Sequence, residues 1–157
     1  MITSGQSPDD QASPPALGVG FELSAVAMAL LDDTLRIVSA NPAAGRMLGT
    51  EHLVGRSIIE FSGPAGAESA AWDLAPVQCG ELTHLEHAAD LLASTGEVIH
   101  ACICWDAIRV PGDPLFILAQ FRDVTAERRQ RHELLASASR QFGGAVRQRS
   151  STRPGGR

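Results

Sequence analysis

Apolar and polar positions alternate along the chain in a pattern that predicts short strands separated by tight turns. Residues 26–31 form a continuous apolar run that stops at Asp32-Asp33, which is a turn signal. Residues 35–38 then mark a second strand. Because the connection between the two runs is so short, the pattern favours an antiparallel hairpin.

A helix is predicted directly after the second strand. Asn41 suits the cap position, and Pro42 suits the first helical position, where its missing N–H would have no partner in any case. Residues 43–48 continue the helix, and Gly49 is its expected stop. A further helical turn is expected over residues 51–54.

Two more helical segments are expected before the next strand. Residues 57–61 carry Ser57 and, three positions on, Glu60, which is the spacing of a capping box. Residues 67–77 are Ala-rich and helix-prone. Pro76 is expected to end that helix early, because proline lacks the N–H that a helix interior needs.

Three strands are predicted in the second half of the chain. They span residues 81–92, 97–110 and 115–124, and the turns at 94–96 and 111–114 contain the Gly and Pro residues typical of tight connections. Five strands, with the helices grouped between the second and the third, predict an α+β domain. Its sheet is antiparallel, and its short helices lie on one face.

The last strand runs directly into a charged, helix-prone segment. Asp123 and Thr125 stand at this junction, where side-chain oxygens can accept the backbone N–H groups of a helix start. Arg122 and Arg128 are candidate partners for Asp123. The junction therefore has two readings: a helix cap alone, or a signalling hinge that includes the cap.

Residues 126–142 are expected to form a C-terminal helix that Gly143-Gly144 brings to an end. Positions with the alternating spacing of a coiled coil are only partly apolar, so they support at most a short, weak helical pair. These positions are Val124, Arg128, Arg131, Leu135, Ala138 and Phe142.

The two ends of the chain differ from the middle in composition and charge. Residues 1–16 and 143–157 are expected to be disordered tails around a domain over residues 17–125. The first 127 residues carry 5 Arg against 17 acids, whereas the last 30 carry 8 Arg against Glu133 alone. The Arg-rich tail is either a solvated segment or a contact for nucleic acid, an anionic surface or an acidic partner.

Cysteine usage and the lack of long apolar segments indicate a cytoplasmic protein. The chain has three cysteines, Cys79, Cys102 and Cys104, which we expect to be reduced thiols. The N-terminus lacks an apolar run with a basic flank, and no apolar run approaches the length of a membrane span.

The order of the elements and a set of short motifs resemble the PAS domain family over residues 21–133. The motifs are Ser39-Ala40-Asn41-Pro42-Ala43-Ala44, Leu48-Gly49, Leu53-Val54-Gly55-Arg56, Leu85-Glu86, Thr95-Gly96-Glu97 and Phe121-Arg122-Asp123-Val124-Thr125-Ala126-Glu127-Arg128. The resemblance implies a five-stranded antiparallel sheet in the order 2-1-5-4-3, with helices that enclose a small cavity on one face. Members of the family bind haem, flavin or small metabolites there, or bind nothing and serve as dimerisation modules.

Two departures from the family's cofactor-binding branches leave the cofactor unknown. The photoreceptive flavin branch carries a reactive cysteine on a helix, whereas no cysteine lies between Asn41 and Gln78. Haem-binding members often use a histidine on the long helix before the third strand, and residues 67–77 contain none. Both departures argue against these cofactors here, although His87 remains as a residue that could contact one.

Alternation along the strands separates an inward face from an outward face. By resemblance to PAS strands, the inward set would line the cavity, and the alternative is plain core packing. The pocket candidates are His87, Leu91, Ala101, Ile103, Trp105, Ile117, Ala119 and Phe121. His84 differs from His87 by an odd number of residues and is expected on the opposite face.

The outward face of the fourth strand carries His100, Cys102 and Cys104, which raises the question of a metal site. Neighbours on one face of a strand lie roughly 6.5 to 7 Å apart. Ligands about 2.0 to 2.3 Å from one zinc ion must lie closer together than that. We therefore expect no metal site, and an outward face that the lead-in segment or a second subunit covers.

No catalytic motif is present, and the sequence indicates a sensory or interaction domain that is not an enzyme. By resemblance, it would bind a small metabolite or a partner and relay the change through its C-terminal helix. We expect no output domain of its own, so that any effect acts through a partner, or else the chain is a fragment of a larger sensor. The expected partner is a second copy or a signalling protein in two-component or cyclic-di-nucleotide signalling. The alternatives are a ligand-free dimerisation module and an adaptor that works through the Arg-rich tail.

Overall fold

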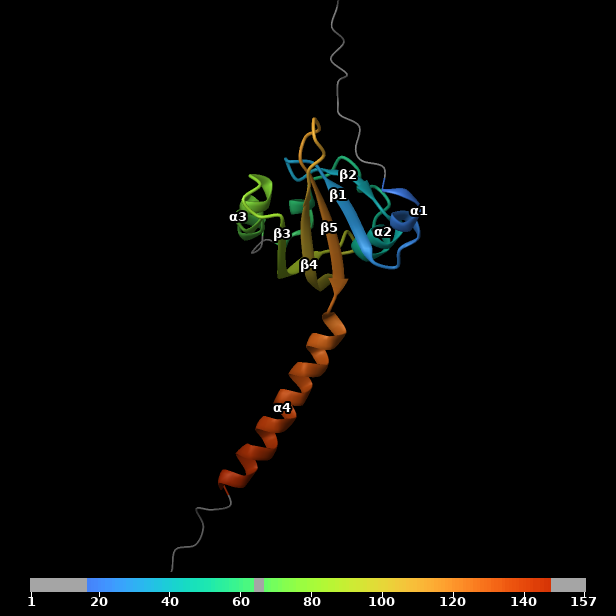
Figure 1. The fold of residues 1–157 in the computed structure, drawn as a ribbon. Coiled ribbons are helices and arrows are strands. Elements are labelled where there is room, and N and C mark those ends of the chain that lie inside the picture. Colours follow the sequence, from blue (N-terminus) through green and yellow to red (C-terminus); the bar gives the residue numbers. More distant parts are fainter. Residues whose placement is uncertain (1–16, 64–66, 148–157) are drawn as a thin grey trace, which may run out of the picture. The chain divides into compact units, whose positions relative to one another are not determined.

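The computed structural model describes residues 17–63 and 67–147, and their strands form one antiparallel sheet (Figure 1). The strand order is β2-β1-β5-β4-β3, which confirms the predicted fold. Short turns join β1 to β2, β3 to β4 and β4 to β5, because Asp, Gly and Pro interrupt the apolar runs there. The strands are β1 (Ala27–Leu31), β2 (Ile37–Ala40), β3 (His84–Leu92), β4 (Val98–Ile108) and β5 (Phe116–Asp123).

Three helical segments between β2 and β3 cover one face of the sheet, which we call the inner face. They are α2 (Pro42–Leu48), the 3-10 helix η1 (Ile58–Phe61) and α3 (Ala67–Gln78). Their buried side chains form one apolar cluster with the inner-face residues of the strands. A short helix, α1 (Gly18–Leu23), precedes the sheet and buries only Phe21.

The contacts divide the chain into two units, 1–123 and 124–157. The first holds the sheet and its helices, and the second holds α4 (Thr125–Arg147). The predicted tail over residues 1–16 lies outside the described residues, as does the Arg-rich tail from residue 148 onward.

Three helix boundaries differ from the sequence predictions. Residues 51–54 form turns and bends without a helix. Pro76 lies inside α3, which continues because Leu74 and Val77 are buried against the core on either side of it. α4 likewise continues through Gly143-Gly144, since glycine lowers helix stability by only about 1 kcal/mol relative to alanine and permits helical angles.

Asn41 is the one buried polar residue among the described residues, and it connects three elements. Its Oδ1 accepts hydrogen bonds from the Ala44 amide at 3.0 Å, which is the predicted cap, and from the Met28 amide at 2.9 Å. Its Nδ2 donates to the carbonyls of Phe21 at 3.0 Å and Val26 at 2.8 Å. One side chain therefore joins α1, the start of β1 and the start of α2.

Candidate functional site

A small cavity of about 20 Å3 lies under the inner face, between η1 and α3 on one side and β3 and β4 on the other. Its lining is mostly aliphatic and aromatic. The lining residues are Ile58, Ile59, Ser62, Leu74, His87, Ala89, Leu91, Ile103 and Trp105.

The strand pairing decides which side chains reach this cavity. His87 pairs with Ile103 across β3 and β4, so both side chains lie on the inner face. Ala89 and Leu91 follow on that face at intervals of two residues. His84, at an odd spacing from His87, lies on the outer face, which confirms the predicted separation of the two histidines.

A complete capping box holds η1 against the cavity. The Ser57 hydroxyl accepts from the Ile59 amide at 3.4 Å, and Glu60 Oε1 accepts from the Ser57 amide at 3.2 Å, as the sequence predicts. Glu60 also forms a 3.0 Å ion pair with Arg56, whose guanidinium lies 4.5 Å from the centre of the Phe61 ring. The hydrogen bond from Arg56, followed by that from the Ser57 amide, lowers the pKa of Glu60.

Three rings extend from the cavity wall to β5. Trp105 Nε1 donates a hydrogen bond to His87 Nδ1 at 3.2 Å, and the two rings stack with centroids 6.0 Å apart. Trp105 also meets the edge of Phe121, with centroids 6.2 Å apart and an interplanar angle of 79°. Because His87 Nδ1 acts as the acceptor, the neutral ring carries its proton on Nε2.

The chemistry of the lining limits what the cavity can hold. About 20 Å3 is enough for one water molecule, but a buried water needs two to four polar partners. Ser62 and His87 are the polar side chains of the lining, and His87 Nδ1 already accepts from Trp105. The site therefore suits a very small guest, or part of one, that is mainly apolar.

Comparison with known proteins agrees with this arrangement of sheet and helices. Residues 19–77 match the family model of the PAS domain. The chain has the PAS fold. Comparison with curated proteins gives no significant match.

Solved PAS structures share the fold at low sequence identity. A PAS domain from Colwellia psychrerythraea is 15% identical with a TM-score of 0.62, and the match covers 68% of this chain and 92% of that one. The PAS domain of an HTR-like protein from Haloarcula marismortui is 23% identical with a TM-score of 0.56, covering 66% and 85%. The PAS domain of a LuxR-family transcriptional regulator from Burkholderia thailandensis, in complex with ethanol, is 16% identical with a TM-score of 0.57, covering 68% and 95%.

Half of the predicted pocket residues line the cavity, namely His87, Leu91, Ile103 and Trp105. The other half lie in the packed core and are at most 3% exposed. These are Ala101, Ile117, Ala119 and Phe121. Inward orientation was predicted for all eight, but α2 packs against β1, the strand beside β5, whereas the cavity lies on the β3 side of the sheet.

Sequence reasoning missed five lining residues: Ile58, Ile59, Ser62, Leu74 and Ala89. The alternation of β3 could have identified Ala89, which lies between His87 and Leu91 on one face. The Ser57–Glu60 capping box located η1 but carried no information on what η1 would face. Leu74 depends on how α3 docks, which a local pattern does not encode.

The junction after β5 differs slightly from the predicted cap. Asp123 is the last residue of β5, and Thr125 is the first residue of α4, one position inside the helix. The first bond of α4 runs from the Arg128 amide to the Val124 carbonyl at 2.9 Å. The strand therefore passes into the helix through Val124 alone.

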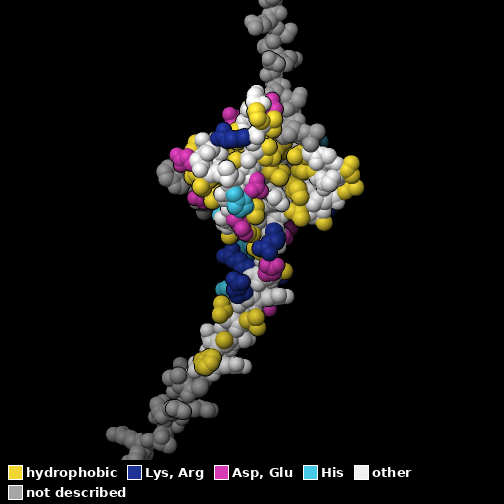
Figure 2. Space-filling view, viewed as in Figure 1, with side chains coloured by type: hydrophobic (Ala, Val, Ile, Leu, Met, Phe, Trp, Pro, Cys, Tyr) yellow, Lys and Arg dark blue, Asp and Glu magenta, His cyan; other side chains and the backbone are white. Residues whose placement is uncertain are grey.

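The outer face of β3 and β4 carries polar cross-strand pairs in place of a cavity. His84 Nδ1 lies 2.6 Å from Asp106 Oδ1, and His100 Nδ1 lies 2.5 Å from Asp90 Oδ1. Histidine and acidic side chains lie side by side in the space-filling view (Figure 2). Within the described residues, no three His, Cys, Asp or Glu side chains are arranged to hold a metal ion.

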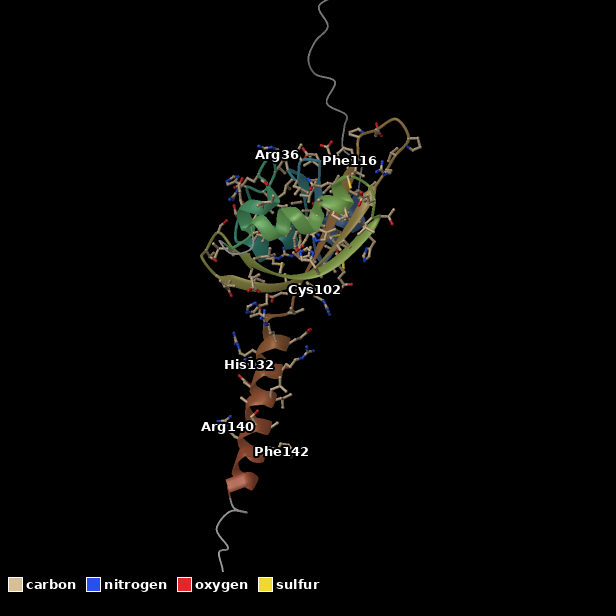
Figure 3. The ribbon with its side chains drawn as sticks, turned by 90° about the vertical axis from the view of Figure 1, so that its left-hand side faces the viewer. Arg36, Cys102, Phe116, His132, Arg140 and Phe142 are labelled. Carbon is tan, nitrogen blue, oxygen red and sulfur yellow. The ribbon has the colours of Figure 1, made fainter. Side chains whose placement is uncertain are left out.

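The surroundings of the two thiols on this face raise the pKa of both. Cys102 Sγ donates to Glu86 Oε1 at 2.9 Å, and this hydrogen bond raises the pKa of Cys102 (Figure 3 labels the residue). Burial, followed by the nearby charge of Glu86, raises the pKa of Cys104. Because the thiolate is the nucleophile, a raised pKa lowers the reactivity of both cysteines relative to an unperturbed thiol.

Over the described ranges, 17–63 and 67–147, the structure has no helix long and apolar enough to cross a membrane.

Proposed function

We propose that this PAS domain is a sensory module that admits a small, mainly apolar guest to its cavity and relays the change through β5 to α4. PAS domains are generally sensory, non-catalytic signalling modules. The observation that carries the proposal is an apolar cavity whose wall includes His87 and Trp105, with Trp105 in ring contact with Phe121.

The size and chemistry of the cavity support a very small apolar guest, or the apolar end of a larger one. An apolar space of this kind gains free energy when it receives matching apolar atoms and gains little from an isolated water. The Burkholderia thailandensis PAS domain is in complex with ethanol, a small molecule with an apolar methyl end. By analogy, a methyl or short alkyl group would occupy the space between Leu74 and Ile103.

The aromatic contacts support a route from the cavity to the junction. A guest that displaces the Trp105 ring would disturb Phe121, which packs against its edge. Trp105 also pairs with Ala119 across β4 and β5, so its backbone and its side chain both contact β5. Phe121 precedes Asp123 by two residues, and the signalling junction of Asp123, Thr125 and Arg128 follows directly. The receiver of the change would be a second copy or a cytoplasmic signalling protein.

The test adds xenon or ethanol to the full chain and monitors binding by methyl and amide NMR. Saturable shifts are expected at Leu74 and Ile103, with smaller shifts reaching Phe121 and Val124. Ala89→Leu should remove these shifts because leucine fills the cavity, whereas Ala88→Leu should retain them because Ala88 lies exposed on the opposite face. Equal responses from the two variants, or no saturable response in the parent, would refute the proposal.

The small volume of the cavity also favours a second candidate, a ligand-free PAS dimerisation module. In that case, Ala89→Leu would stabilise the fold by filling a void, and it would leave every functional interaction of the chain unchanged. Sedimentation of the parent and of this variant at matched concentrations, together with the xenon measurement, separates the two candidates.

A further inference from the structure

α4 carries an apolar stripe that nothing in its own unit covers. Leu134, Leu135 and Phe142 are 72%, 62% and 76% exposed. Phe142 projects from one side of α4 and Arg140 from the other (Figure 3). An isolated helix is marginally stable in water, so a helix with such a stripe gains most of its stability by packing it against a partner.

The positions on this side follow the spacing of a coiled-coil seam. We define the α4 seam as Arg128, Arg131, Leu135, Ala138 and Phe142, which alternate by three and four residues. The seam changes character along its length: Arg side chains gather at the start of α4, and hydrophobic side chains follow (Figure 2).

A parallel, in-register pair of α4 helices would match this seam poorly. Each seam position would face its own copy, so Arg131 would face Arg131 of the second copy, and Arg128 likewise. Like charges at facing positions repel, and the large Phe142 rings would face each other across the same interface.

We propose that α4 pairs with α4 of a second copy of this chain in the antiparallel direction. In this register Leu135 faces Ala138 of the second copy, so a large side chain meets a small one in two symmetric layers. Arg131 lies over the Phe142 ring of the second copy, also twice, where a guanidinium on an aromatic face is attractive. The cationic half of each seam therefore meets the apolar half of the other, and no arginine meets an arginine.

The helix dipole favours the same direction. Antiparallel pairing places the Arg-rich first turns of one α4 beside the last turns of the other, where unsatisfied carbonyls carry partial negative charge. The pairing of α4 does not depend on a guest in the cavity. The proposed partner is a second copy of this chain, as opposed to an acidic helix or an anionic membrane surface.

The relative direction of the two α4 helices can be measured on the full chain with a spin label at position 129 or at position 137. The label is attached to an introduced keto side chain, so the native cysteines remain unmodified. In the antiparallel register, symmetry-related labels are offset along the axis by about 22 Å at position 129 and by about 2 Å at position 137. The label-to-label distance is therefore expected to be clearly longer at 129 than at 137. Equal distances at the two positions would indicate a parallel pair and overturn the proposal.

Substitutions in the α4 seam provide a second test of the proposed dimer. Leu135→Ser and Phe142→Ser should each raise the dimer dissociation constant at least tenfold in sedimentation equilibrium. Arg140→Ser, off the seam on the same helix, should change it less than twofold. Three results would overturn the proposal. The parent chain could stay monomeric at all concentrations, both seam variants could leave the dimer intact, or the chain could be a monomer whose α4 binds anionic vesicles.

Discussion

The two faces of β3 and β4 carry similar residue types and have opposite properties. On the inner face, His87 accepts a hydrogen bond from a buried indole and forms part of an apolar wall. On the outer face, His84 and His100 pair with aspartates in contact with solvent. Residue type alone therefore does not assign a role to a histidine in this sheet, whereas the face on which it lies does.

The strongest test of this comparison is the Trp105→Ala variant. Trp105 is 3% exposed and contacts both His87 and Phe121, so its loss should lower the free energy of unfolding by about 3 to 5 kcal/mol. Cys104→Ala changes the preceding residue of β4, on the opposite face, and should lower the free energy of unfolding by less than about 1.5 kcal/mol. Chemical denaturation of both variants measures the difference, and equal losses would mean that the inner face is not the more tightly packed one.

Two histidine variants, one on each face, test the same difference with smaller expected changes in the free energy of unfolding. His87→Ala leaves the buried Trp105 N–H without its acceptor and should cost about 1 to 3 kcal/mol. His84→Ala removes a solvent-exposed pair with Asp106 and should cost about 0 to 1 kcal/mol. The same denaturation experiment applies, with His87→Phe as a variant that keeps a ring but offers no acceptor. If His87→Phe were as stable as the parent, the hydrogen bond would contribute nothing and only ring packing would remain.

The smallest expected effect concerns thiol reactivity on the outer face. Glu86 raises the pKa of Cys102, so at pH 8 a smaller fraction of this thiol is ionised than in an unperturbed cysteine. Glu86→Gln removes the negative charge and should speed alkylation of Cys102 severalfold. Mass spectrometry after timed iodoacetamide treatment follows each cysteine, and the exposed Cys79 serves as the internal control. An unchanged rate at Cys102 would show that Glu86 does not control its ionisation.

Local patterns in the sequence predicted the fold well because each pattern depends only on residues that are close together in the chain. Alternation on β3 and β4 separates inner from outer side chains, and the strand order followed from the family resemblance. The caps at Asn41 and Ser57 follow from side chains that bond backbone groups two or three residues away. The same local logic failed at Pro76 and at Gly143-Gly144, where a penalty of about 3 kcal/mol for proline and about 1 kcal/mol for each glycine does not end the helix.

Alternation within each strand specifies which side chains face inward, whereas the docking of separate elements sets where the inner face stays open. Ile58 and Leu74 come from segments that precede β3 in the chain, yet they close the cavity against Ile103. Asn41 shows the same division, since its cap is local but its bonds to Phe21 and Val26 depend on how α1 and β1 meet. Packing fills volume, and the volume left beside a strand depends on every element that docks there, which no single stretch of sequence encodes.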